Sequence, residues 1–222
     1  MAHYSPDPDL DPYEAENAFY LQSHPSRIAK LLAHYELYRK IVGLPGSLIE
    51  AGVYKGASLM RFAAFRALLE NDYSRPLVGF DAFGSFPRTA VSGQEDRTFI
   101  DEFESRGGPG IARDRLSSLF AEKGYGNIAL HEGDIFDTLP AYLRQNPAAK
   151  VAFLHLDLDV YEPTAFVLKT LAPHMVRGGL IVFDDYGLVK GATSAADELC
   201  SELNLEIGKL SNYEIPAFIV MP

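Results

Sequence analysis

Acidic side chains gather in two short runs in the C-terminal half of the sequence. Asp157 and Asp159 lie in the run 155–161, where they alternate with apolar residues, and Asp184 and Asp185 are adjacent. Three or four carboxylates in one small space suit a hard cation such as Mg²⁺, which prefers oxygen ligands. A bound divalent cation lowers the pKa of a hydroxyl group and orients it, so the pattern predicts a metal site that activates a hydroxyl. The alternative is that these acids cap helices or remain solvated.

A glycine-containing turn, Glu50–Ser58, indicates a second kind of binding site. Gly52 and Gly56 stand where a backbone must approach a ligand closely. The turn has neither the complete Gly-x-Gly-x-x-Gly fingerprint of dinucleotide-binding proteins nor a Lys-Ser/Thr phosphate loop. Ser58 and the start of the following helix could bind a carboxylate, and Glu50 suits an ammonium group. A ligand that carries both groups, such as the methionine part of S-adenosylmethionine, fits better than a pyrophosphate; otherwise the glycines only permit a tight turn and Ser58 only caps a helix.

Two more acids follow predicted strands and extend this ligand hypothesis. Asp81 ends one strand, where an acid typically accepts hydrogen bonds from ribose hydroxyls. Asp134 follows Gly133 at the end of another predicted strand, so its carboxylate could meet an adenine amino group while Ile135 packs on the ring. Each acid could instead be a solvated loop residue.

Three further reactive side chains have structural interpretations of at least equal weight. His155 could act as a base, but it precedes the end of its strand, and a core histidine is an equal interpretation. His131 has the same ambiguity. Cys200 lies in a predicted helix with an apolar face, and we expect it to be a small core residue.

Strand and helix patterns alternate along the chain and explain why the acids should meet. Short apolar runs predict strands at residues 47–51, 77–81, 127–131, 151–157, 179–184, 205–210 and 215–221. Helical spacing occurs before and between them, at residues 28–41, 58–69, 138–145, 164–171 and 192–203. This order predicts βαβ units in a mostly parallel α/β sheet, closed by a C-terminal antiparallel hairpin. In such a sheet the carboxyl ends of the strands share one edge, where ligands bind.

Two segments fall outside this alternation. Residues 83–115 hold Gly, Pro, Ser and many charges, and we interpret them as a long active-site loop with a short helix. Residues 1–24 begin with a polar, acidic and proline-rich stretch, and we interpret them as an N-terminal arm or lid. Residues 25–222 then form one domain, because a chain of 222 residues suffices for one sizeable core.

Composition excludes several classes of function. The chain has 20 basic and 30 acidic residues and a formal net charge of −10, so neither a nucleic-acid-binding surface nor a polybasic membrane contact is expected. No apolar run approaches the length of a membrane span, and the N-terminus is unlike a signal peptide. Because the chain has one cysteine, an internal disulfide is impossible, and we expect the protein to be cytoplasmic.

Five segments together resemble the macrocin O-methyltransferase family and, more distantly, catechol O-methyltransferase. They occur in the right order at residues 50–58, 80–87, 133–140, 156–164 and 182–186. The family includes sugar O-methyltransferases of antibiotic biosynthesis. The resemblance implies a Rossmann-like class I methyltransferase with a seven-stranded, mostly parallel sheet, helices on both faces, S-adenosylmethionine as the donor and usually Mg²⁺.

The resemblance also implies roles for individual residues. The cofactor pocket would be formed by Glu50, Gly52, Val53, Tyr54, Gly56, Ser58, Asp81, Ser85, Gly133, Asp134 and Ile135. The metal ligands would be Asp157, Asp184 and Asp185, with Asp157 also the general base. The acceptor would be a hydroxylated small molecule, with a deoxysugar or glycosylated natural product as the first choice and a catechol-like phenol as the second. Members of the family often form oligomers, so the resemblance allows a homo-oligomer.

Two other functions remain open. The run Asp157-Leu-Asp159 also fits the Asp-x-Asp metal motif of nucleotide-sugar glycosyltransferases, although the Glu50–Ser58 turn and the separate pair of aspartates argue against that class. A non-catalytic methyltransferase-like module would bind the cofactor without transferring a methyl group.

Overall fold

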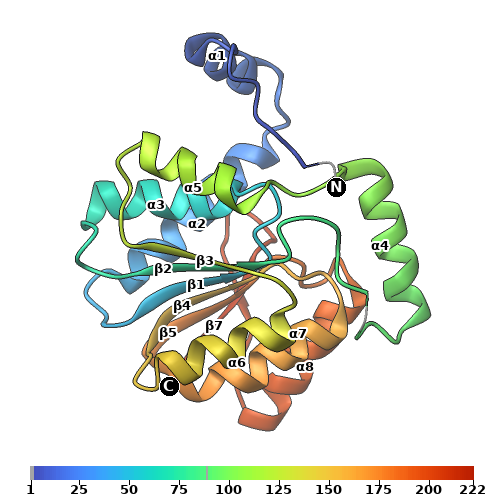
Figure 1. Cartoon of the computed structure of the whole chain (residues 1–222). Coiled ribbons are helices and arrows are strands. Elements are labelled where there is room, and N and C mark those ends of the chain that lie inside the picture. The colour runs from blue at the N-terminus through green and yellow to red at the C-terminus, as the bar shows by residue number, and fades with distance from the viewer. Residues whose placement is uncertain (1–2, 89) are drawn as a thin grey trace.

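A sheet of seven strands forms the centre of the computed structural model, which describes residues 3–88 and 90–222. The first two residues of the predicted arm and residue 89 of the predicted loop therefore lie outside the described residues. The strand order is β3-β2-β1-β4-β5-β7-β6 (Figure 1). The strands are β1 Ser47–Ala51, β2 Leu77–Asp81, β3 Ile128–Glu132, β4 Val151–Leu156, β5 Met175–Phe183, β6 Gly208–Lys209 and β7 Ala217–Val220.

The direction of the strands confirms the predicted α/β class. Strands β1 to β5 are parallel, and β7 pairs antiparallel with both β5 and β6. The C-terminal hairpin is shorter than its sequence pattern predicts, because residues 210–216 form an irregular connection between β6 and β7. The order of the strands reverses between β1 and β4, which is the place where open parallel sheets bind ligands.

Helices cover both faces of the sheet (Figure 1). One face carries α2 Ser26–Ile41, α3 Ala57–Leu69 and α5 Arg113–Glu122, and the other carries α6 Ile135–Gln145, α7 Tyr161–Leu171 and α8 Lys190–Leu203. Each face has its own core, and neighbouring residues of one strand enter different cores, as Leu48 and Ile49 do. Because both faces are buried, β1 and β4 consist of buried residues throughout. Within the described residues no helix is both long and apolar enough to span a membrane.

The segment 83–115 contains more regular structure than its composition predicts. Instead of a short helix it holds α4, Gln94–Gly107, with 14 residues, and the start of α5. Ile100 is fully buried in α4 and packs with Val91 and Val160 in a small separate core. This contact fixes α4 at the edge of the domain, beside the carboxyl ends of the strands (Figure 1).

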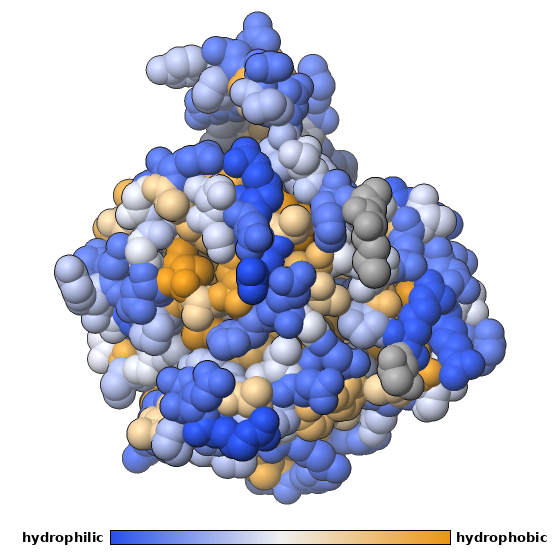
Figure 2. Space-filling view, viewed as in Figure 1, coloured by the Kyte–Doolittle hydropathy of each residue, from blue (hydrophilic) through white to orange (hydrophobic). Residues whose placement is uncertain are grey.

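The N-terminal arm is partly helical and projects from the body of the molecule (Figure 1). Helix α1, Pro12–Gln22, begins after Asp11, whose Oδ1 accepts the backbone N–H groups of Tyr13 and Glu14. None of its residues is buried, and Figure 2 shows it covered mostly by hydrophilic residues. It therefore adds nothing to either core.

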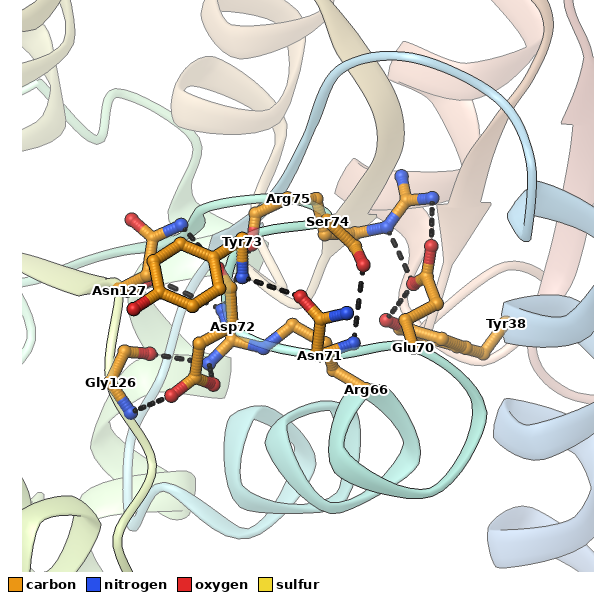
Figure 3. A network of polar contacts seen from close by, with 10 residues as sticks. All are labelled: Tyr38, Arg66, Glu70, Asn71, Asp72, Tyr73, Ser74, Arg75, Gly126 and Asn127. Atoms are coloured by element: carbon orange, nitrogen blue, oxygen red, sulfur yellow. Dashed lines mark hydrogen bonds and ion pairs between the residues drawn. The ribbon is translucent and has the colours of Figure 1, made fainter.

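A network of buried charges joins α2 and α3 to the amino ends of the strands (Figure 3). Arg75, directly before β2, donates to the two carboxylate oxygens of Glu70 at 2.7 and 2.8 Å. It also donates to three backbone carbonyls between the end of α2 and β1. Glu70 accepts a further hydrogen bond from the Tyr38 hydroxyl, and Arg66 binds Asp72 and backbone carbonyls before β3. The two arginines thus supply donors to carbonyls that secondary structure leaves unpaired.

Arg75→Met should remove the centre of this network. The change leaves Glu70 and three backbone carbonyls without their donor, and breaking a buried ion pair typically costs about 3–5 kcal/mol. We expect the free energy of unfolding, measured by urea denaturation, to fall by that amount. Arg106→Met, which breaks an exposed pair with Glu102, is the control and should leave unfolding unchanged. Equal losses in the two variants would contradict a structural role for Arg75.

Candidate active site

A cavity of about 390 Å³ opens at the carboxyl ends of the parallel strands. Its wall includes a residue at or just beyond the end of each of them, namely Gly52, Asp81, Gly133, Asp157 and Asp184. The cavity therefore spans the point between β1 and β4 at which the strand order reverses. Residues of α2 and of the segment that contains α4 form its other sides.

Three carboxylates converge on one part of this wall. One side-chain oxygen from each of Asp157, Asp184 and Asp185 lies within 4.8 Å of the other two. Asp159 lines the same cavity. Asp157 follows β4, the other pair follows β5, and these two strands are hydrogen-bonded neighbours, so the sheet itself brings the acids together.

Burial and the proximity of other acids disfavour the ionised forms of three acids in this group. Burial, followed by the charges of Asp184 and Asp185, raises the pKa of Asp157 well above its usual range. Burial and neighbouring acids also raise the pKa of Asp185, and they raise that of Asp159 to about 8. Raised carboxyl pKa values mean that too little positive charge surrounds the ionised forms. The group therefore suits a cation.

Asp184 differs from the other acids because basic side chains approach both of its oxygens. The Lys30 ammonium lies 2.5 Å from Oδ2, and the Nε2 atoms of His155 and His34 lie 3.5 and 3.7 Å from Oδ1. Burial would raise the pKa of Asp184, but His155, His34 and Lys30 hold it well below its usual range. Asp184 is therefore the ionised anchor of the group.

A second buried carboxylate, Glu50, is linked to Asp184 through His155. Oε1 of Glu50 is 2.8 Å from Nδ1 of His155, and both side chains are fully buried. Burial would lower the pKa of His155, but Asp184 and Glu50 raise it to about 10. A positively charged imidazole on β4 thus joins Glu50 on β1 to Asp184 after β5. His155 is a bridging core residue rather than a base that faces the cavity.

Asp81 organises the turn that follows β1. Its Oδ2 accepts the backbone N–H groups of Val53 at 2.8 Å and Tyr54 at 2.9 Å, and Oδ1 accepts a third from the segment after β2. On the other side of the turn, Gly52 has a φ of +89°, and a Cβ there would lie 1.8 Å from the backbone oxygen of Asp157. The close approach of the chain segments after β1 and β4 therefore requires glycine at position 52.

Most of the residues predicted to bind a cofactor or a metal line this cavity. They are Gly52, Tyr54, Asp81, Ser85, Gly133, Asp134, Ile135, Asp157, Asp184 and Asp185. The remaining four, which do not belong to the cavity wall, are Glu50, Val53, Gly56 and Ser58. Val53 packs in the core below the turn, Gly56 precedes α3 and packs against α5, and Ser58 lies in the first turn of α3.

The sequence pattern does not reveal two parts of the wall. Arg27 and Lys30 reach the cavity from α2, and Phe103 and Glu104 reach it from α4. Basic residues three positions apart on a helix are typical of a solvated face, and α4 lies in a segment whose composition indicates a loop. The partner of Lys30 is an acid 154 residues away, and such a distant contact leaves no local pattern in the sequence.

Helix α4 is tied to the turn after β1 by hydrogen bonds at its C-terminal end. The Tyr54 hydroxyl and the Lys55 ammonium both donate to the backbone carbonyl of Gly107, at 2.5 and 2.7 Å. Glu104 also accepts the backbone N–H of Phe86, at 2.8 Å. These contacts hold the outer wall of the cavity against its base.

Comparison with known proteins identifies relatives over most of the chain. A family model described as Macrocin-O-methyltransferase (TylF) matches residues 26–209. A curated relative, the 8-demethyl-8-(2,3-dimethoxy-alpha-L-rhamnosyl)-tetracenomycin-C 4'-O-methyltransferase of Streptomyces olivaceus, is 27% identical over 191 residues, which are 83% of this chain and 71% of the relative. Demethyldecarbamoylnovobiocin O-methyltransferase of Streptomyces niveus is 26% identical over 172 residues, which are 73% of this chain and 61% of that protein.

Solved structures agree on the fold. CalS11, a calicheamicin methyltransferase, is 28% identical with a TM-score of 0.71, and the match covers 96% of this chain and 86% of CalS11. The O-methyltransferase NovP has the same fold, with a TM-score of 0.73 at 21% identity over 87% of this chain and 80% of NovP. An O-methyltransferase from Bacillus cereus in complex with S-adenosylhomocysteine matches with a TM-score of 0.56 at 13% identity over 93% of this chain and 86% of that one. These matches confirm the predicted methyltransferase architecture.

The raised pKa of Asp159 predicts a pH dependence of stability in metal-free protein. Its carboxyl group stays protonated in the folded protein up to about pH 8 but ionises in the unfolded chain above about pH 4. Between these values the folded state binds the extra proton, so this group makes stability fall as pH rises. In Asp159→Asn the free energy of unfolding should therefore decrease less between about pH 5 and 7.5, by up to about 1.4 kcal/mol per pH unit.

Urea denaturation at several pH values in the presence of a chelator measures this difference. Asp137→Asn, which changes an exposed acid on α6, is the control and should follow the wild-type slope. Parallel slopes for the wild type and Asp159→Asn would show that Asp159 has an ordinary pKa.

Proposed function

The chain belongs to the macrocin O-methyltransferase family and is an S-adenosylmethionine-dependent methyltransferase, and we propose that it methylates a hydroxyl group of a sugar carried by a small natural product. The observation that carries this proposal is the cavity at the strand ends, which both carboxylates and aromatic side chains line. The carboxylates suit a hydroxylated ligand, and the aromatic side chains suit an apolar ring system.

The relatives support an acceptor of this kind. The Streptomyces olivaceus enzyme is named for a rhamnosyl tetracenomycin. An apo structure of CalS11, with 27% identity and a TM-score of 0.70 over 96% of this chain and 87% of that one, is described as a TDP-rhamnose 3'-O-methyltransferase. In this chain Phe86, Phe103 and Phe136 line the cavity that also contains the acids, so a sugar and an attached apolar group would both find complementary surfaces.

The methyl donor would be held by residues that follow β1, β2 and β3. Asp81 would accept a hydrogen bond from a ribose hydroxyl through Oδ1, which accepts one backbone N–H group, whereas Oδ2 already accepts two. One oxygen of Asp134 accepts the N–H of Phe136, which leaves the other for an amino group, and Ile135 offers an apolar surface to the base. The residues fit the donor because they line one continuous cavity. When bound, the donor supplies an electrophilic methyl group.

The three converging carboxylates would hold Mg²⁺. Asp157, Asp184 and Asp185 offer only oxygen atoms, which are the ligands that Mg²⁺ prefers. The raised pKa values of Asp157 and Asp185 indicate that their ionised forms lack a compensating positive charge, which a bound cation would supply, so the residues fit the ion. A divalent cation at this place would lower the pKa of an acceptor hydroxyl.

Asp157 would accept the proton of the acceptor hydroxyl on one of its carboxylate oxygens. Added positive charge lowers the pKa of Asp157, so a cation in the group leaves it ionised and able to act as a base. The other walls orient the acceptor and exclude water, and orientation provides a large share of such catalysis. Helix α4, bound to the turn after β1 through Tyr54 and Gly107, forms the outer wall.

Asp157→Asn tests the base. We expect kcat to fall by about 10²–10⁴-fold, because the amide cannot accept the proton. Formation of S-adenosylhomocysteine, measured with rhamnosides and nucleotide-linked rhamnose as acceptors, gives the rate. The variant should still bind S-adenosylhomocysteine in calorimetry, and Asp137→Asn should behave as the wild type in both assays. Undiminished turnover by Asp157→Asn would remove Asp157 as the base.

Calorimetric titration with S-adenosylhomocysteine tests the donor pocket. The wild type should bind, and Asp81→Ala should bind at least about tenfold more weakly, since a hydrogen bond to a charged group contributes about 1.5–3 kcal/mol. Because Asp81 also holds the turn after β1, circular dichroism checks that the Asp81→Ala variant is still folded. Failure of the wild type to bind, or equal binding by Asp81→Ala, would contradict the assignment of this pocket.

The same titrations separate the two rival functions. Binding of a nucleotide sugar together with no binding of S-adenosylhomocysteine would favour a glycosyltransferase. Binding of S-adenosylhomocysteine without turnover of any hydroxylated acceptor would favour a non-catalytic module.

A further inference from the structure

Lys30 places a positive charge within the group of carboxylates that would bind a metal ion. It belongs to α2, outside the sheet, and its ammonium lies 2.5 Å from Oδ2 of Asp184. Its side chain is 16% exposed and forms part of the cavity wall. Burial would lower the pKa of Lys30, but Asp184, Asp157 and Asp185 together raise it, so the ammonium is charged.

The second oxygen of Asp184, Oδ1, is not accessible to a ligand in the cavity. Oδ1 is buried and makes no hydrogen bond, and it faces Nε2 of His155 at 3.5 Å and Nε2 of His34 at 3.7 Å. Oδ2, which contacts Lys30, is therefore the oxygen available to a ligand in the cavity. Within the described part of the chain, Asp157 and Asp185 have no ion pair of 4.0 Å or less, so the competition concerns Asp184.

We propose that Lys30 is a built-in cation of the carboxylate group, which competes with a divalent metal ion for Oδ2 of Asp184 and thereby sets the metal affinity of the site. This inference rests on the proposed function, because it takes Asp157, Asp184 and Asp185 as the metal ligands. Two positive charges a few ångströms apart repel each other, so a metal ion at Oδ2 displaces the ammonium. Lys30 is a positioning residue, because in the metal-free protein its ammonium holds Oδ2 of Asp184 in an ion pair.

A purely structural role for Lys30 predicts the opposite effect on metal binding. If Lys30 only preserved the shape of the wall, its loss would leave Asp184 without its ion-pair partner, disturb the arrangement of the carboxylates and weaken the metal site. Competition predicts that its loss strengthens metal binding, because Oδ2 becomes free and one positive charge leaves the group. The direction of the change therefore distinguishes the two roles.

Mn²⁺ is a suitable probe, because it takes the same oxygen ligands as Mg²⁺ and the free ion can be followed by electron paramagnetic resonance without any measurement of activity. Lys30→Met, which keeps the length of the side chain and removes its charge, should bind Mn²⁺ at least about tenfold more tightly than the wild type. Lys30→Arg keeps the charge and should retain the weak binding of the wild type. Lys40→Met, at an exposed position of the same helix, is the matched control and should change nothing.

Lys30→Gln provides a second test that does not depend on how Lys30→Met folds. Its amide can still donate a hydrogen bond to Asp184, so the wall keeps a contact while the charge is gone, and Mn²⁺ should again bind more tightly. Equal or weaker Mn²⁺ binding by the uncharged variants, including no binding by any of the proteins, overturns the inference.

Titration of the same proteins with S-adenosylhomocysteine keeps the two proposals apart. If the wild type binds S-adenosylhomocysteine but the uncharged variants gain no Mn²⁺ affinity, the role of Lys30 is contradicted and the donor pocket stands. If the wild type does not bind S-adenosylhomocysteine, the proposed donor site itself is contradicted.

Discussion

The crowding of acidic side chains at the ends of β4 and β5 is the constraint on which the rest of the site depends. The parallel sheet brings four aspartates to one cavity, and buried carboxylates are costly unless positive charge accompanies them. Two positive groups approach Asp184, namely His155 from β4 and Lys30 from α2. Since Lys30 belongs to α2, its ion pair with Asp184 links that helix to the carboxyl ends of the strands. The compensation is partial, because the pKa values of Asp157, Asp159 and Asp185 remain raised.

The turn after β1 and the group of acids are held in place by shared contacts. Gly52 has no room for a side chain because the backbone of Asp157 lies against it. Asp81 holds the same turn from the opposite side by accepting two of its N–H groups. Glu50 reaches beneath the turn through His155, whose other nitrogen faces Asp184. The same contacts therefore position the proposed donor pocket and the proposed metal site, so a substitution that shifts one should also shift the other.

The parts of the site that sequence reasoning could reach are those with a local pattern. An apolar run that ends in an acid predicts both a strand and the position of its carboxylate, as Asp81 and Asp184 show. Contacts between distant residues leave no such pattern. Glu50 lies in a strand buried on both faces, and its partner His155 is 105 residues away, so its direction could not be inferred. The sequence pattern does not predict the length of α4, because an amphipathic helix is recognised by its apolar face. Among the described residues, Ile100 is the only apolar residue that α4 buries completely.

The contrast between Asp157 and Asp184 shows that a carboxylate's role depends on its neighbours. The two side chains follow adjacent strands and approach each other closely, yet the pKa of one is raised and that of the other is lowered. The difference arises because the basic groups contact Asp184 and not Asp157. Asp184 is thus ionised under all ordinary conditions, whereas the protonation of Asp157 responds to any further cation that enters the cavity. If Asp157 is the base, as proposed, a bound cation would bring it to the ionised state in which it can accept a proton.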